Sequence, residues 1–85
     1  MATERIVVGA SGDDDNARSA ARRLRDEGHE VVFVGGHQTP EHLVRTAVAE
    51  DAVRLVVDAD DASLARVREL CREQGADDVR VEPVV

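Results

Sequence analysis

RIVVGASGDDDNARSAARRLRDEGHEVVFV, residues 5–34, is the stretch that decides the fold. An apolar run at 5–8 is followed by apolar residues at helical spacing, and a second apolar run comes at 31–34. The residues at helical spacing are Ala17, Ala20, Ala21 and Leu24. Gly28 stands where the residue just past a helix belongs. The stretch therefore predicts a strand, a helix and a second strand parallel to the first, joined by a right-handed crossover.

The rest of the chain continues this alternation. Thr39 is predicted to cap a second helix that starts at Pro40. Its buried stripe is expected to contain Leu43, Val44, Ala47 and Val48. VRLVV at 53–57 predicts a third strand, and the VRVE of residues 79–82 predicts a fourth.

A third helix is predicted between the last two strands. Asp60 or Asp61 can cap it, and Gly75 ends it. Its apolar residues are Leu64, Val67, Leu70 and Cys71, so Cys71 is interpreted as a small core residue rather than a nucleophile. The alternation predicts an α/β fold, a small three-layer open parallel sheet of four strands in the order 2-1-3-4 with three helices.

One part of the sheet is expected to lack a helix. In the order 2-1-3-4 the first helix covers one face, and the second and third helices cover the other. The third and fourth strands are then bare on the side of the first helix. Arg80 and Glu82 alternate with Val79 and Val81 along the fourth strand, and Arg54 is expected to share their side of the sheet. The sequence thus places charged residues on the bare face.

Composition limits the classes of partner. The 85 residues are expected to form one domain, with a net charge of −7 and 11 basic residues that are all Arg. This charge disfavours nucleic acids and anionic membranes as partners. An acidic, lysine-free chain is typical of a salt-adapted, halophilic cytosol, although a GC-rich genome produces the same bias. One cysteine excludes an internal disulfide, and the N-terminus has no long apolar stretch, so a cytoplasmic location is expected.

A ligand site in such a sheet is expected at the carboxyl ends of the strands, where residues 9–16, 35–39 and 58–61 form loops. GASGDDDN at 9–16 has no third glycine and no lysine, so phosphate binding is disfavoured. Residues 13–15 are three aspartates, interpreted first as helix-start residues that suit the helix dipole. The alternative is a Mg²⁺ site that uses the carboxylates of Asp13 and Asp58.

VVFVGGHQTPEHLVRTAVAEDAVRLVV, residues 31–57, resembles the second half of the cobalamin-binding domain of methylmalonyl-CoA mutases. The specific pieces are the turn at Thr39, Pro40 and Glu41 and the Glu50-Asp51 pair at the end of the following helix. The resemblance implies a flavodoxin-like parallel sheet. It identifies residues 1–85 as a single, truncated domain of the cobalamin-binding type.

The ligand motif of that family is broken in this chain. The family's first loop reads Gly-x-Asp-x-His-x-x-Gly, in which the His coordinates cobalt, the Asp orients the His, and the last Gly admits the nucleotide tail. Here Gly9 matches the first glycine, but Ser11 stands for the Asp, Asp13 for the His and Asn16 for the last Gly. These four residues form a degenerate cobalamin loop, and a carboxylate is a poor substitute for imidazole on cobalt. Cobalamin is therefore not the expected cofactor, although the resemblance leaves it open.

The three histidines are not expected to replace the missing ligand. His29 falls in a turn at the opposite end of the sheet, and the other two, His37 and His42, are separated by a helix start. All three are interpreted as surface residues.

A second resemblance is to response-regulator receivers, in which acidic residues hold Mg²⁺ around a phosphorylatable Asp. Asp58 would be the acceptor and residues 13–15 the metal ligands. The residues GASG intervene between the first strand and the acids, and the required Lys is absent.

The sequence favours a non-catalytic accessory or interaction module without His ligation of cobalt. The alternatives are a corrinoid-binding small subunit or partner of a mutase-type isomerase, and a receiver-like Mg²⁺ or phosphoryl switch. No activated nucleophile is apparent, so catalysis is not expected. A homodimer or a protein partner such as a mutase subunit is expected instead.

Overall fold

The computed structural model describes residues 3–84 and has seven elements in strict alternation. They are β1 (Arg5–Ala10), α1 (Asp15–Asp26), β2 (Glu30–Gly35), α2 (Pro40–Ala49), β3 (Arg54–Asp58), α3 (Asp61–Glu73) and β4 (Arg80–Pro83). All neighbouring strands are parallel, in the order β2-β1-β3-β4. The predicted α/β fold is confirmed. None of the helices in residues 3–84 is long and apolar enough to cross a membrane.

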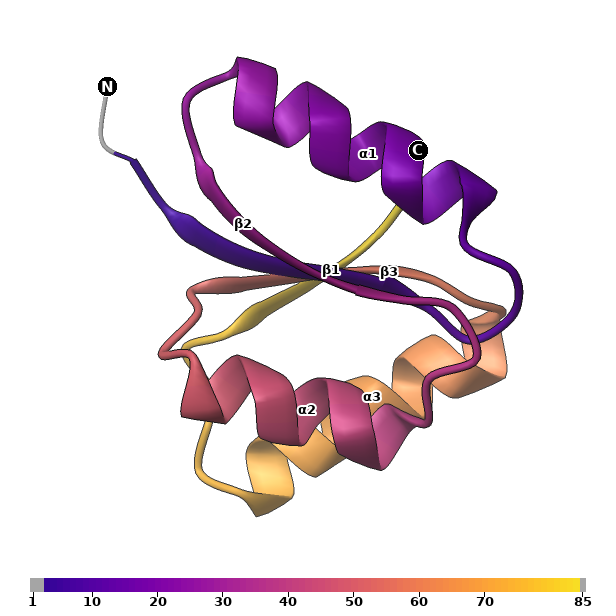
Figure 1. Ribbon diagram of the computed structural model, residues 1–85. Helices are drawn as coiled ribbons and strands as arrows, with labels where there is room; N and C mark the ends of the chain where they lie inside the picture. The colour runs from indigo at the N-terminus through magenta and orange to yellow at the C-terminus, as the bar shows by residue number, and fades with distance from the viewer. Residues whose placement is uncertain (1–2, 85) are drawn as a thin grey trace.

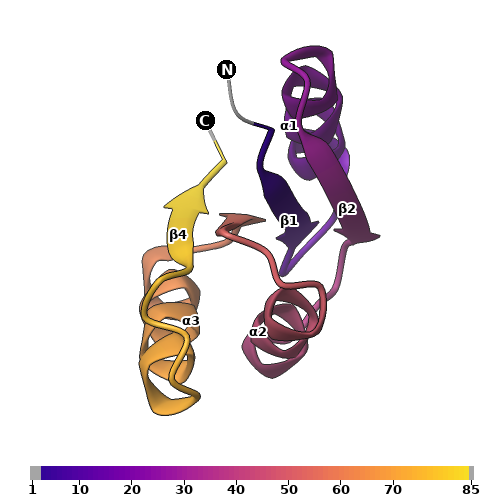
Figure 2. The ribbon, with the colours of Figure 1, turned by 90° about the vertical axis from the view of Figure 1, so that its left-hand side faces the viewer.

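The helices lie on the two faces of the sheet as predicted. α1 covers one face, over β1 and β2, while α2 and α3 lie side by side on the other face (Figure 1). A view from the side shows α3 beneath the β4 edge of the sheet and α2 beneath its centre (Figure 2). On the side of α1, that helix also contacts β3, where Val56 is buried among α1 residues, so the prediction that the third strand is bare on this side is wrong and only β4 has no helix over it.

The core forms two clusters separated by the sheet. The strand β1, buried from residue 6 to residue 10, contributes to both, because its side chains alternate between the faces. Ile6 and Val8 face the small residues of α1, and Val7 faces α2 and α3. Cys71 is buried in the second cluster, which agrees with its interpretation as a core residue.

The buried stripe of α2 is narrower than predicted. Leu43, Val44 and Ala47 are buried, but the Val48 side chain is 48% exposed. Val48 lies at the margin of the stripe. There it lines a cavity together with Ala52, which follows α2, and with residues 74–76, which follow α3. The prediction for Val48 is therefore wrong, because helical spacing alone does not set the width of the contact with the sheet.

The predicted helix ends are found at the predicted residues. The Thr39 hydroxyl accepts a hydrogen bond from the His42 backbone N–H at 3.1 Å. At α3 the cap is Asp60 rather than Asp61, since a carboxylate oxygen of Asp60 accepts from the Ser63 N–H at 2.7 Å. This bond lowers the pKa of the Asp60 carboxyl.

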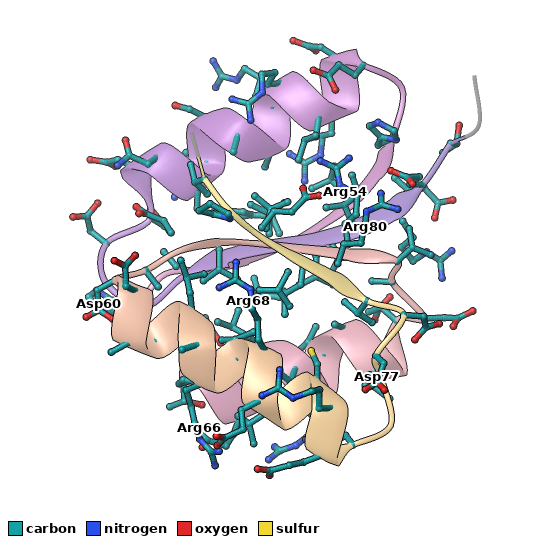
Figure 3. All side chains as sticks on the ribbon, turned by 180° about the vertical axis from the view of Figure 1, so that it is seen from behind. Arg54, Asp60, Arg66, Arg68, Asp77 and Arg80 are labelled. Carbon is teal, nitrogen blue, oxygen red and sulfur yellow. The ribbon has the colours of Figure 1, made fainter. Side chains whose placement is uncertain are left out.

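Ion pairs occupy the bare face of β4 and the adjoining end of β3. Arg54 donates to Glu82 at 2.9 Å and to Glu4 at 3.3 Å, and Arg80 donates to Glu4 at 2.8 Å. Figure 3 shows Arg54 and Arg80 together over β4. Partial burial opposes protonation of Arg54, but its bonds to the two glutamates raise its pKa overall. A charged network thus covers the part of the sheet that no helix covers.

Candidate functional site

Three loops meet at the carboxyl ends of the strands, where the sequence predicts a site. The Ser11 N–H donates to the Asp58 carbonyl at 3.0 Å, which ties the loop after β1 to the end of β3. The His37 N–H donates to the Gly12 carbonyl at 2.8 Å, and the Gln38 N–H to the Ala10 carbonyl at 3.0 Å. The loop after β1 is therefore held from both sides by backbone hydrogen bonds.

Close approach between two of these loops depends on Gly36. A Cβ atom at Gly36 would lie 2.5 Å from the Gly12 carbonyl oxygen and 3.3 Å from the Asp14 backbone nitrogen. Both neighbours are backbone atoms, so the contact has little room to relax. The sequence analysis missed this role, although the Gly35-Gly36 pair directly after a strand was an available signal.

The aspartates of the first loop contact the start of α1. A carboxylate oxygen of Asp13 accepts a hydrogen bond from the Asp15 N–H at 3.2 Å. Asp14 occupies the N-cap position and pairs with Arg18, one turn later, at 3.2 Å. Asp15 lies in the first helical turn. These contacts agree with the interpretation of the three residues as helix-start residues.

Asn16 and Asp58 connect the start of α1 to the end of β3. The Asn16 amide nitrogen lies 3.4 Å from a carboxylate oxygen of Asp58. Asp58 was predicted as a metal ligand together with Asp13, whose own carboxylate is bonded to the Asp15 N–H. Within residues 3–84 no group of three or more His, Cys, Asp or Glu side chains is placed to hold a metal ion.

The loop does not fit cobalt ligation by a nitrogen donor. Asp13, which the resemblance aligns with the family's His, has only carboxylate oxygens, and one of them accepts a hydrogen bond from the Asp15 N–H. Ser11 is exposed at the position of the residue that orients the His. Asn16 places an amide side chain, bonded to Asp58, where the family has a glycine. The donor atoms and the hydrogen bond between Asn16 and Asp58 both disagree with an imidazole-ligated corrinoid.

The histidines differ from one another in the structure. His37 is exposed beside the first loop and has a positive φ of 56°. The side chain of His29 is only 13% exposed, and its Nδ1 accepts a hydrogen bond from the Glu4 N–H at 3.1 Å. The interpretation of His29 as a surface residue is therefore wrong, because the contact with Glu4 at the start of β1 covers it.

Most of this chain is similar in sequence to a mutase subunit. It is 37% identical, over 78 residues, to a protein named 2-hydroxyisobutanoyl-CoA mutase small subunit from Aquincola tertiaricarbonis. The matched region is 87% of this chain but only 57% of that relative, so the chain spans little more than half of the relative's length. No protein-family model matches the chain. The similarity supports the resemblance to a mutase-type cobalamin-binding domain at the level of the domain.

Proposed function

We propose that the protein is an accessory module, similar to mutase-associated cobalamin-binding domains, that acts through a protein partner and does not ligate cobalt through its first loop. Asp13 carries this proposal. Its carboxylate lies at the position of the cobalt-ligating His and is bonded to the Asp15 N–H. In this proposal, the residue that the resemblance aligns with the ligating His serves the helix start instead.

The similarity to a mutase small subunit supports the partner half of the proposal. The name of that relative, a small subunit, describes a chain that assembles with another chain. The bare face of β4 offers a surface for such assembly. A corrinoid-binding small subunit is the second candidate, and the same similarity favours it.

Hydroxocobalamin distinguishes these two functions. We expect the wild-type protein to elute from gel filtration without corrinoid and to leave the visible spectrum of the corrinoid unchanged. The matched variant Ser11→Asp/Asp13→His/Asn16→Gly restores the family motif and is expected to retain corrinoid with the spectral shift of an imidazole ligand. Retention of corrinoid by the wild type would support the second candidate and contradict the proposal.

The partner is tested separately with the large subunit of a 2-hydroxyisobutanoyl-CoA mutase. We expect the two chains, when co-expressed, to elute together from gel filtration at a mass above that of either chain alone. Bovine serum albumin at the same concentration is the control for non-specific association. Separate elution of the two chains would contradict the proposed mutase partner.

The receiver-like alternative makes a different prediction. Beryllofluoride with Mg²⁺ would perturb the amide NMR signals around Asp58 if this residue were a phosphoryl acceptor. We expect no such perturbation, because Asp58 is engaged by Asn16 and no third acidic ligand accompanies it among the described residues.

A further inference from the structure

A groove lies between α3 and β4, away from the rim described above. It encloses a cavity of about 350 Å³. The floor is formed by Cys71, Ala76, Val79 and Val81, and the walls by Arg68, Arg72 and Asp77. Figure 3 looks onto this side of the molecule, with Arg68 directed from α3 toward β4 and Asp77 at the far end. The groove therefore combines an apolar floor with a basic wall on α3, formed by Arg68 and Arg72, and has one acidic residue, Asp77, among its lining.

The basic wall has no carboxylate partner. Arg68 makes one hydrogen bond of 3.4 Å to the Val81 carbonyl, and no ion pair of Arg68 or Arg72 is found within residues 3–84. The two glutamates of the same helix are engaged elsewhere, because Arg66 pairs with Glu69 and with Glu73.

Arg66 also reaches Glu41 of α2 at 3.7 Å, which places this ion-pair cluster on the side of α3 next to α2. Figure 3 shows Arg66 pointing away from the groove. In a chain with a net charge of −7, the side of α3 next to β4 thus carries two arginines that form no ion pair within residues 3–84, and Asp77 is the one carboxylate among the residues that line the groove.

The floor stays neutral at physiological pH. Burial, assisted by the nearby Asp77 carboxylate, raises the pKa of the Cys71 thiol, which therefore remains protonated. Val79 and Val81 are only partly buried, although both pack against the core. An apolar side chain entering the cavity would complete their burial.

The edge of β4 limits what can pair with it. The Arg80 N–H donates to Val53 and the Val84 N–H to Val57, so residues 80, 82 and 84 direct their backbone groups toward β3. The backbone N–H and C=O groups of Val81 and Pro83 consequently point away from β3, toward the open edge of the sheet. Pro83 has no N–H, and Arg68 already covers the Val81 carbonyl. Only the Val81 N–H remains as an outward donor on this strand, which suits a short extended segment rather than a full added strand.

We propose that the groove between α3 and β4 binds a short, extended acidic segment of a partner protein. One apolar side chain of the segment fills the cavity above Val79 and Val81. The flanking carboxylates meet Arg68 and Arg72, and a backbone carbonyl accepts from the Val81 N–H. The inference rests on the proposed function only in requiring a protein partner.

The test uses the full chain and defined peptides. Because the protein has no Trp and no Tyr, the fluorescence anisotropy of a peptide tryptophan reports binding without background. The probe is acetyl-Trp-Gly-Glu-Asp-Leu-Val-Asp-Glu-amide. One comparison peptide replaces Leu-Val by Ser-Ser, and another replaces every acidic residue by Lys. The amide NMR signals of ¹⁵N-labelled protein locate the binding surface.

We expect the acidic apolar peptide to bind at least about tenfold more tightly than either comparison peptide, and to shift the signals of Val81 and residues around Cys71. Equal binding of the Ser-Ser peptide would overturn the proposal, because the cavity would then not be used. Tighter binding of the Lys peptide, or signal shifts confined to another surface, would overturn it as well.

The variant Arg68→Glu/Arg72→Glu is expected to weaken binding by about tenfold or more. Arg22→Glu/Arg45→Glu changes the net charge equally on exposed positions outside the groove and is expected to keep affinity within about twofold. Arg68→Gln/Arg72→Gln serves if the reversed charges impair folding, as judged by circular dichroism. None of these measurements involves corrinoid or a mutase subunit. If the peptide binds but the subunits do not assemble, the proposed mutase partner is refuted while the proposed binding groove is supported.

Discussion

The absence of a side chain at Gly36 allows two loops to pack closely at the carboxyl ends of the strands. The carbonyl oxygen of Gly12 occupies the space that a Cβ of residue 36 would need. The loop after β1 can therefore close onto the loop after β2 only while residue 36 is glycine. This packing holds the residues of the degenerate cobalamin loop in place.

We predict that Gly36→Ala lowers the free energy of unfolding by about 1–3 kcal/mol, because the new methyl group overpacks against backbone atoms. Gly12→Ala is the matched control, since a Cβ at Gly12 would meet no atom within 4 Å. Urea denaturation of the two variants measures the difference. Equal stability of the two variants would show that the loops separate readily.

The Asp60 carboxylate makes stability depend on pH. Its hydrogen bond from the Ser63 N–H lowers the pKa of the folded state below the ordinary aspartate value. A lowered folded-state pKa gives stability that is present above the unfolded-state pKa and is lost as pH falls through the folded-state pKa.

We predict that Asp60→Asn flattens the acid limb of the stability curve. The amide oxygen still caps α3, but it does not titrate in this range. Unfolding free energies measured from roughly pH 5 down to pH 2 should fall less steeply for the variant than for the wild type. Glu4, whose pKa is lowered by Arg80 and Arg54, retains part of the slope in both proteins. Parallel curves would contradict the capping role of the Asp60 carboxylate.

At the scale of elements, β3 and β4 are joined by charge as well as by backbone pairing. Arg54 is 19% exposed and contacts glutamates from β4 and from the segment before β1. On the opposite face of the sheet, Leu55 and Val57 are buried against α2 and α3. The same strand is thus apolar on the face covered by α2 and α3, while its other face has Val56 buried against α1 and the charged Arg54 at one end.

We predict that Arg54→Ala destabilises the fold by about 1–2 kcal/mol, because Glu82 and Glu4 lose a partly buried hydrogen-bonding cation. Arg45→Ala, at an exposed position of α2 with no ion pair in residues 3–84, should change stability by less than about 0.5 kcal/mol. Thermal unfolding followed by circular dichroism provides the comparison. If both variants unfold at the wild-type temperature, the network does not stabilise the edge of the sheet.

At the scale of the whole molecule, the excess of acidic residues opposes compaction. The chain has 18 Asp and Glu against 11 Arg, and the folded domain has a radius of gyration of 11.5 Å. Most charges therefore lie within a few screening lengths of one another at low salt. Added salt should relieve this repulsion more than it weakens the few partly buried ion pairs.

We predict that the unfolding temperature rises as NaCl increases from about 0.05 M to about 1 M. The variant Asp26→Asn/Asp78→Asn removes two exposed negative charges and should show a smaller rise. A steady fall of the wild-type unfolding temperature with salt would indicate instead that the ion pairs dominate.

Most of the fold could be predicted from local patterns in the sequence. Periodic apolar residues, the caps at Thr39 and Asp60 and the glycines after the helices are decided within a few residues of chain, so the elements could be predicted with ends close to those found. A helix between each pair of successive strands then predicted a parallel sheet, and right-handed crossovers restricted its topology. Val48 and His29 were misjudged because their burial depends on residues brought next to them by folding.

The sequence by itself determined the alternation of strands and helices, the parallel sheet and the presence of a carboxylate rather than an imidazole at residue 13, because each follows from residue types at short spacing. Only the tertiary structure decided that Asn16 bridges to Asp58, that Glu4 meets Arg80 from 76 residues away, and that Arg68 and Arg72 form no ion pair within residues 3–84. Such contacts depend on the distances between side chains on different elements. Those distances are set by the packing of α1, α2 and α3 against the sheet.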